Sequence, residues 1–294
     1  TNWGREHPGG LPILMNLGGC LVAEGEVEEG MKMLRRALAI ARERLGPDHS
    51  TLLACLNTLG NALNGEGNHL EAEKLAQEGV AMARRLFGED TPQLMFGLRI
   101  LSDAQGRLDQ LGEADTNSEA ALLMARKLYP KPHLLLVAPL STRADILGRL
   151  GRPAEAVPLM REALQMERQF FGPDHPHVAS SLRDLGELLT ESGEFKDAGQ
   201  VLGEARDLLE KLNGKDHSTV VYVTALLGKC LLEQKRNAEA KLLFEKLLAM
   251  QNGGERLTSD QVSAIHFNLA LILLNEGEPR AAEAKCREAI ALQE

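Results

Sequence analysis

Apolar residues recur along the chain at spacings of three and four, and short polar or glycine-containing breaks separate the runs. In the stretch 43–84, two such runs flank the break 64–68, and each follows the 3.6-residue period of an amphipathic helix. The first run comprises Leu52, Leu56, Leu59 and Leu63; the second comprises Ala72, Leu75, Ala76, Gly79, Val80 and Ala83. The strict alternation typical of strands is absent. We therefore predict helices and no strands.

This two-helix pattern repeats every 42 residues, and seven such repeats account for all 294 residues. A leucine column and a column of small residues keep the same phase throughout. The leucine column reads Leu17, Leu59, Leu101, Arg143, Leu185, Leu227 and Leu269, and the small column reads Gly30, Ala72, Ala114, Ala156, Ala198, Ala240 and Ala282. The predicted repeats are 1–42, 43–84, 85–126, 127–168, 169–210, 211–252 and 253–294, with no separate linker.

The ends of the predicted helices carry recurring signals. Glycine recurs in the break within most repeats, as at Gly25 and Gly193, where it supplies the positive φ that ends a helix. The third repeat has Asp109 there instead. An aspartate precedes most first helices, and aspartate is a favoured N-cap. We expect the N-caps at Asp48, Asp90, Asp174 and Asp216.

Small residues at facing positions allow two helix backbones to approach closely. Each hairpin leaves an apolar face open, and stacking on the next hairpin covers it. The predicted fold class is all-α: a right-handed α-solenoid of seven helix-turn-helix repeats in a single domain. HEAT and armadillo arrays have a similar period and are the alternative fold.

The residues that carry these columns resemble the tetratricopeptide repeat. The Leu-Gly pairs of the first helices match its motif, as do the small columns of the second helices; these pairs are Leu17-Gly18, Leu59-Gly60, Leu185-Gly186 and Leu227-Gly228. The 42-residue period is similar to that of kinesin light chain, whose repeats are longer than the usual 34 residues. Two residues depart from the leucine columns, Arg143 and Gln105, so the third and fourth repeats are expected to be the most distorted.

Composition and charge narrow the classes of partner. The net charge is −9 and only 3% of residues are aromatic, which argues against a nucleic-acid surface and against anionic lipids. No run approaches the ~20 apolar residues of a membrane helix. None of the four cysteines forms a C-x-x-C pair, so we expect four buried thiols in a reducing compartment and a cytoplasmic location.

The histidines invite a metal-site interpretation, since five of the eight share one column of the repeat: His7, His49, His133, His175 and His217. Equivalent positions in a stack lie about a helix diameter apart, ~8–10 Å, whereas zinc needs its ligands at ~2 Å. A loop and capping role is therefore expected. Nucleophile-elbow, phosphate-loop, zincin and dinucleotide motifs are absent. We predict no enzyme activity, no cofactor and no metal.

The resemblance implies that the first helices line a concave groove that binds a protein or peptide partner. The candidate groove residues are Asn57, Asn61, Asn64, Arg99, Arg107, Arg149, Arg183, Tyr222 and Lys229. Asparagine has donors and acceptors that suit an extended peptide backbone, and arginine suits carboxylates. The alternative is that these charges pair with one another, as Arg99 with Asp103 or Arg183 with Glu187.

The last repeat differs, because Phe267, Leu271 and Leu274 are apolar at the groove positions and no polar cap follows. The predicted function is a non-catalytic adaptor that binds an extended peptide. The alternatives are binding to a flanking segment of the same protein, and self-association through the C-terminal repeat.

Overall fold

The computed structural model describes residues 8–130, 132–250 and 257–292, and these residues form two compact units, 1–152 and 153–294. We call them the N-terminal and C-terminal units and treat each by itself. Every regular element in the described ranges is helical. The predicted all-α class is therefore confirmed, while the arrangement of all seven repeats in one solenoid stays a prediction.

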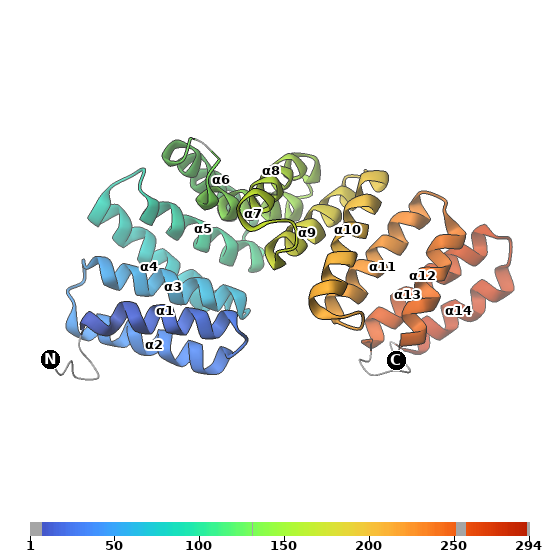
Figure 1. The fold of residues 1–294 in the computed structure, drawn as a ribbon, viewed down its shortest axis with the longest axis horizontal. Helices are drawn as coiled ribbons and strands as arrows, with labels where there is room; N and C mark the ends of the chain where they lie inside the picture. Colours follow the sequence, from blue (N-terminus) through green and yellow to red (C-terminus); the bar gives the residue numbers. More distant parts are fainter. Residues whose placement is uncertain (1–7, 131, 251–256, 293–294) are drawn as a thin grey trace. The chain divides into compact units, whose positions relative to one another are not determined.

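The N-terminal unit begins with a short 3-10 helix and continues with seven α-helices, shown in blue to green in Figure 1. Each α-helix packs against the next along the chain, and α1, α3, α5 and α7 also contact one another in that order. The elements are η1 (Pro8–Gly10), α1 (Leu11–Ala23), α2 (Val27–Arg44), α3 (Ser50–Gly65), α4 (His69–Phe87), α5 (Pro92–Arg107), α6 (Leu111–Leu128) and α7 (Leu134–Arg149).

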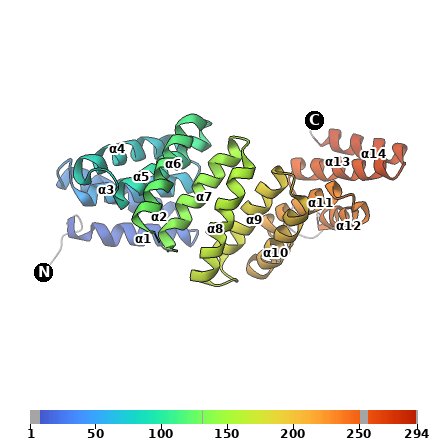
Figure 2. The same ribbon diagram turned by 90° about the horizontal axis from the view of Figure 1, so that it is seen from above.

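The C-terminal unit contains the remaining seven helices. Successive helices again pack against each other, and the last two lie side by side as a hairpin (Figure 2). The elements are α8 (Pro153–Phe171), α9 (Pro176–Glu191), α10 (Phe195–Asn213), α11 (Ser218–Glu233), α12 (Asn237–Met250), α13 (Ser259–Asn275) and α14 (Pro279–Ala291).

The spacing of the helices reproduces the period of the sequence. The seven second helices of the repeats begin at intervals of 42 residues, at Val27, His69, Leu111, Pro153, Phe195, Asn237 and Pro279. A residue with positive φ ends the break before each of them. In the third repeat this residue is Asp109, with φ of 62°, a conformation that aspartate tolerates better than most side chains.

The N-caps lie one residue beyond the predicted aspartates, so that prediction was wrong. In four first helices the cap is the histidine of the shared column, whose ring Nδ1 accepts the backbone N–H two residues later; His49 accepts from Thr51 at 3.1 Å. Thr91 caps α5 through its hydroxyl, which accepts the backbone N–H of Leu94, three residues later. The four histidine caps are His49, His133, His175 and His217. The predicted capping role of this column is confirmed for them, and His7 lies outside the described residues.

Aromatic rings support two of these caps. The ring of His133 stacks on Tyr129, and the ring of His175 stacks on Phe171, both with centroids 4.5 Å apart. The displaced aspartates have other partners. Asp48 accepts from Arg85 at 2.8 Å, and Asp174 from Lys211 at 2.5 Å, so they tie a loop to the second helix that follows 37 residues later.

The interior of each unit consists largely of the predicted leucine and alanine columns. Where Arg143 interrupts the leucine column it is buried, and its Nη1 donates to the Asp115 carboxylate and at 3.0 Å to Ser118 Oγ. Gln105 is also buried and accepts from Asn117 Nδ2 at 2.7 Å. Polar side chains of α6 satisfy both residues, so these positions join α6 to its two neighbours.

The cysteines differ from the prediction of four buried thiols. Cys55 and Cys230 are buried, but Cys20 is exposed and Cys286 is only partly covered. Burial raises the pKa of the Cys55 thiol to about 11. The exposed cysteine lies on the apolar α1, where hydropathy does not reveal which face the neighbouring helices cover.

Several arginines of the second helices form ion pairs with the second helix of the next repeat. Arg35 of α2 donates to Glu71 of α4, and Arg42 to Glu78, both 36 residues later. In the C-terminal unit Arg161 of α8 donates in the same way to Asp197 of α10 at 2.9 Å. We call these ion pairs between successive second helices rungs.

Candidate functional site

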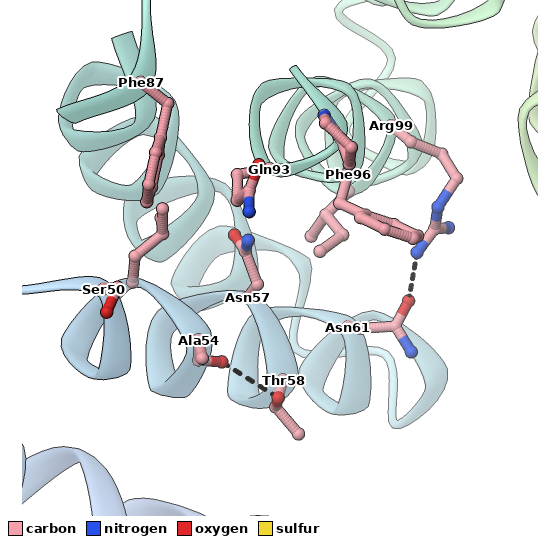
Figure 3. Close-up of a pocket in the computed structure, with 12 residues that line it drawn as sticks. Ser50, Ala54, Asn57, Thr58, Asn61, Phe87, Gln93, Phe96 and Arg99 are labelled. Atoms are coloured by element: carbon pink, nitrogen blue, oxygen red, sulfur yellow. Dashed lines mark hydrogen bonds between the residues drawn. The ribbon is translucent and has the colours of Figure 1, made fainter. Parts of the chain in front are cut away.

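A cleft of 570 Å³ opens between α3 and α5 in the N-terminal unit. Its walls are apolar, and amide and guanidinium groups stand around it (Figure 3). The lining residues are Ser50, Leu53, Ala54, Asn57, Thr58 and Asn61 of α3, Phe87 at the end of α4, and Pro92, Gln93, Phe96, Arg99 and Ile100 of α5. The cleft therefore combines hydrogen-bonding groups with a hydrophobic surface, as ligand sites usually do.

Helical spacing brings the polar side chains of the cleft together. Asn57 and Asn61 are four residues apart on α3, so they share one face of that helix. Arg99 of the adjacent α5 donates from Nη2 to Asn61 Oδ1 at 2.6 Å. This bond joins the two helices across the cleft (Figure 3).

Asn57 lies deeper in the cleft than Asn61. Its side chain points toward that of Gln93 on α5 (Figure 3). Its Oδ1 is buried and has no hydrogen-bond partner in the described part of the chain. A Cβ at Gly79 of α4 would lie only 3.0 Å from this oxygen. Gly79 thus makes room for Asn57 in a column that otherwise holds alanine in most repeats.

Charged residues continue from this cleft along α5 to α7. Arg107 lies 3.8 Å from the carboxylate of Asp103 and 3.8 Å from that of Asp145, and Arg149 donates to Asp145 at 3.0 Å. Burial raises the pKa of Asp103, while Arg99 and Arg107 act in the opposite direction. We call these residues the charged strip. Arg107 and Arg149 therefore follow the alternative given for the groove residues, in which their charges pair with one another.

Arg99 differs from the other arginines of the strip. It is half-buried, and burial lowers its pKa, with Asp103 opposing this shift. The one hydrogen bond that it donates goes to a neutral amide, and its Nε has no partner among the described residues. Its charge is therefore the least neutralised of the three.

Asn64 does not line the cleft, although it shares the stripe of Asn57 and Asn61. It is buried, and its Nδ2 donates to the backbone carbonyl of Ile100 at 2.9 Å. This bond ties α3 to α5 in the interior. The structure therefore assigns Asn64 to packing and not to a groove surface.

The candidate residues of the C-terminal unit lie on α9 and α11. Arg183 of α9 donates to Asp184 at 2.7 Å and lies 3.7 Å from Glu187. Tyr222 of α11 is hydrogen-bonded to Glu187, and burial together with that carboxylate raises the pKa of the tyrosine. Lys229 is exposed on the same helix. These charges largely pair with one another.

The apolar side chains predicted at the last repeat are at the surface of α13. Phe267 is 55% exposed and Leu274 is 52% exposed, while Leu271 between them is partly covered. Tyr222 of the neighbouring α11 is 46% exposed. The predicted apolar character of this end is present, and what covers it stays a prediction.

Sequence reasoning missed several residues of the cleft. Ser50, Phe87 and Gln93 lie at helix ends, where the inward positions of a repeat motif do not extend. The sequence contains one signal that could have revealed Phe87. An aromatic residue ends α4 and a proline starts the next helix, which places Phe87 beside the start of α5.

No group of three or more metal-ligating side chains gathers in the described ranges. Within the same ranges, none of the helices combines the length and the apolar character needed to cross a membrane.

Comparisons with known proteins identify the family. A tetratricopeptide repeat model matches residues 11–85 and 135–211, and a second tetratricopeptide repeat model matches residues 225–294. The chain therefore belongs to the tetratricopeptide repeat family, whose fold is a protein-interaction fold. No curated protein matches the sequence at a significant level.

Several solved structures share the fold. The nearly identical TPR-like repeats of a putative kinesin light chain from Podosopora anserina are 22% identical, with a TM-score of 0.54 over 70% of this chain and 98% of theirs. BtubC from P. vanneervenii is 23% identical, with a TM-score of 0.60 over 75% of this chain and 89% of its own. A Rap protein in complex with competence and sporulation factor is 10% identical, with a TM-score of 0.60 over 95% and 74%. The suspected kinesin-light-chain-like type is confirmed at the level of the fold.

Proposed function

We propose that the chain is a non-catalytic module that binds an extended segment of a partner protein in the cleft between α3 and α5. The observation that carries the proposal is that Asn57, Asn61 and Arg99 face one cavity with apolar walls. Asparagine amides can donate to and accept from a peptide backbone in either chain direction.

The apolar walls and the polar groups of the cleft would bind different parts of the partner segment. Leu53, Phe87 and Phe96 would take an apolar side chain of the bound segment, which supplies most of the affinity. Arg99 would meet an acidic side chain or a backbone carbonyl, because its charge is the least neutralised nearby. The rest of the charged strip would contribute little, since its groups already pair.

The fold of the relatives supports ligand binding in general. The Rap protein of the same fold was solved in complex with competence and sporulation factor. The buried thiols Cys55 and Cys230 agree with the proposed cytoplasmic location, because burial raises the pKa of each and leaves it in the unreactive thiol form.

The test uses peptides recovered from a phage-displayed library of random linear sequences selected on the intact chain. Affinities of the fluorescein-labelled peptides are measured by fluorescence anisotropy. Replacing Arg99 by Ala should weaken binding about tenfold to a hundredfold, as for loss of a hydrogen bond to a charged group, ~1.5–3 kcal/mol. Asn61→Ala, at an exposed position, should weaken it by less.

The matched control is Arg183→Ala, which removes an equally half-buried arginine from the same column in the C-terminal unit. It should leave the affinity within about twofold, since an effect below ~0.5 kcal/mol is expected away from the site. Failure to recover any binding peptide, or equal losses from Arg99→Ala and Arg183→Ala, would contradict the proposal.

A further inference from the structure

A second cavity, of 520 Å³, lies in the C-terminal unit on the side of the second helices. The helix α11 forms its floor, with Leu227 and Leu231, and α10 and α12 form its two walls. Its lining includes Lys196 and Arg206 of α10, Arg236 before α12, and Glu239 and Leu242 of α12. We call it the α10–α12 trough.

A rung is missing on the face of α10 that borders the trough. Arg161 of α8 pairs with Asp197 of α10, and Arg35 of α2 pairs with Glu71 of α4. The positions 42 residues after Arg161 and Asp197 are Gly203 and Glu239. Since glycine has no side chain, this rung cannot form between α10 and α12. A Cβ built at Gly203 meets nothing within 4 Å, so the space beside it is open.

Because its rung partner is missing, the carboxylate of Glu239 pairs with an arginine at the start of its own helix. Glu239 accepts two hydrogen bonds from Arg236, each 2.7 Å long, at the edge of the trough. The space that a rung would cover is left above the apolar floor. Leu242 projects beside it and is 67% exposed, the second-largest exposed fraction among the large apolar side chains of the described residues.

The charge of the trough is opposite to that of the chain. Its ionisable lining comprises three bases, Lys196, Arg206 and Arg236, and one acid, Glu239. The whole chain carries a net charge of −9. Arg206 bonds Asp207 through Nε and Nη2, and Arg236 bonds Glu239 through the same two atoms, so each keeps Nη1 for a further acceptor.

We propose that the α10–α12 trough binds an acidic amphipathic helix of a partner protein, at a site separate from the cleft between α3 and α5. The apolar face of that helix would pack on Leu231 and Leu242, in the helix-in-groove mode. Its acidic residues would meet Lys196, Arg206 and Arg236. A basic, leucine-floored trough on an acidic protein selects such a helix by charge as well as by shape.

The test uses a phage-displayed library of helical peptides with Leu, Ile or Phe on one face and Glu or Asp on the other. Peptides selected on the intact chain are labelled with fluorescein and titrated by anisotropy. The variant Gly203→Arg restores the side chain of the rung and fills the trough. It should weaken binding at least tenfold, even though it adds a positive charge that would otherwise attract an acidic peptide.

Gln77→Arg is the matched control, because Gln77 is exposed, lies in the same column of the second repeat and gains the same charge. This variant should bind the peptide within twofold of the wild type. Leu242→Asp should also weaken binding at least tenfold without touching the rung position. Circular dichroism checks that each variant melts at or near the wild-type temperature.

Three outcomes would overturn the inference: no peptide is selected, Gly203→Arg binds as tightly as Gln77→Arg, or the chain dimerises in sedimentation experiments and Gly203→Arg abolishes the dimer. The last would assign the trough to a second copy. The variant Arg99→Ala should leave this binding unchanged, so failure here is distinguishable from failure of the cleft.

Discussion

The first helices of the two units carry polar residues in the same columns of the repeat, yet they use them differently. In the N-terminal unit Asn57, Asn61 and Arg99 surround an open cleft, with one hydrogen bond between them. In the C-terminal unit Arg183 is held by Asp184 and Glu187. The two arginines stand in the same column, but Arg183 is hydrogen-bonded to a carboxylate, whereas Arg99 is hydrogen-bonded to a neutral amide.

The interiors of the two units differ in a related way. The N-terminal unit buries Arg143 against Asp115 in its leucine column, whereas the C-terminal unit keeps Leu185 and Leu227 there. Asn64 likewise bonds the backbone of the next first helix from the interior. Buried arginine and asparagine side chains thus join helices of the N-terminal unit, whereas the buried polar side chains described in the C-terminal unit are Glu167 and four serine or threonine residues.

The largest expected effect comes from breaking the buried pair. Asp115→Ala leaves the Arg143 side chain, only 9% exposed, without its carboxylate partner, and we expect a loss of about 3 kcal/mol in the free energy of unfolding. The comparison variant is Asp197→Ala in the C-terminal unit, whose exposed pair with Arg161 should cost less than ~1 kcal/mol. Urea denaturation measures both. Equal losses would remove the distinction between the interiors.

Filling the cleft should separate binding from stability. Ala54→Phe places a ring in the cleft at the column where Phe96 and Tyr222 stand in other repeats. We expect peptides selected on the wild-type chain to bind at least tenfold more weakly, ~1.4 kcal/mol. Ser180→Phe, at an exposed position of the same column in α9, should leave the affinity unchanged. If Ala54→Phe and Ser180→Phe bind the peptides equally well, the peptides do not bind in the cleft.

A buried carboxyl distinguishes α8 of the C-terminal unit from the second helices of the N-terminal unit. Glu167 is buried where Ala41, Ala83 and Ala125 stand in earlier repeats, and its Oε2 has no partner among the described residues. Burial raises its pKa, and a hydrogen bond with Ser181 opposes the shift only in part. Burial therefore disfavours the charged form of Glu167.

The sign of the pH dependence follows from this shift. Between the pKa of a free glutamate, about 4.3, and the raised pKa of Glu167, the folded state binds more protons than the unfolded state. Stability contributed by this group is therefore present at low pH and lost as the pH rises through the raised pKa. Glu167→Gln should remove this slope and raise the free energy of unfolding at neutral pH by about 1 kcal/mol. The urea midpoints of the wild type and of Glu167→Gln are measured across this pH range. An equal fall of both midpoints with rising pH would contradict the prediction.

The smallest effect concerns the rungs, which both units share. Arg35→Ala and Arg161→Ala each remove one exposed ion pair between second helices. Each should lower the free energy of unfolding by about 0.5 kcal/mol or less, and by still less at high salt. Thermal melts at two salt concentrations provide the measurement. A loss of several kcal/mol would mean that rungs, and not the leucine columns, hold the repeats together.

The sequence alone predicts the helices well, because the 42-residue period fixes where each second helix begins. It places the N-caps one residue early. Aspartate is intrinsically the better cap, so the local sequence favours it. The histidine cap is supported by the stacking of Phe171 at the end of α8 on His175 at the start of α9, which depends on the folded structure.

The cleft could be predicted only in part. Helical spacing identifies Asn57, Asn61 and Arg99, but the same spacing also selects Asn64, which the packing of α5 buries. Spacing cannot reveal Phe87 or Gln93 at the helix ends, nor a rung whose partners are 36 residues apart. These features depend on how close one repeat comes to the next, which is a property of the folded chain.

The most direct test of the cleft between α3 and α5 is NMR spectroscopy of the ¹⁵N-labelled chain during titration with a selected linear peptide. We predict that the largest chemical-shift changes occur at the side-chain amides of Asn57, Asn61 and Gln93 and at the guanidinium of Arg99. Changes confined to α9 and α11, around Arg183 and Tyr222, would contradict the account.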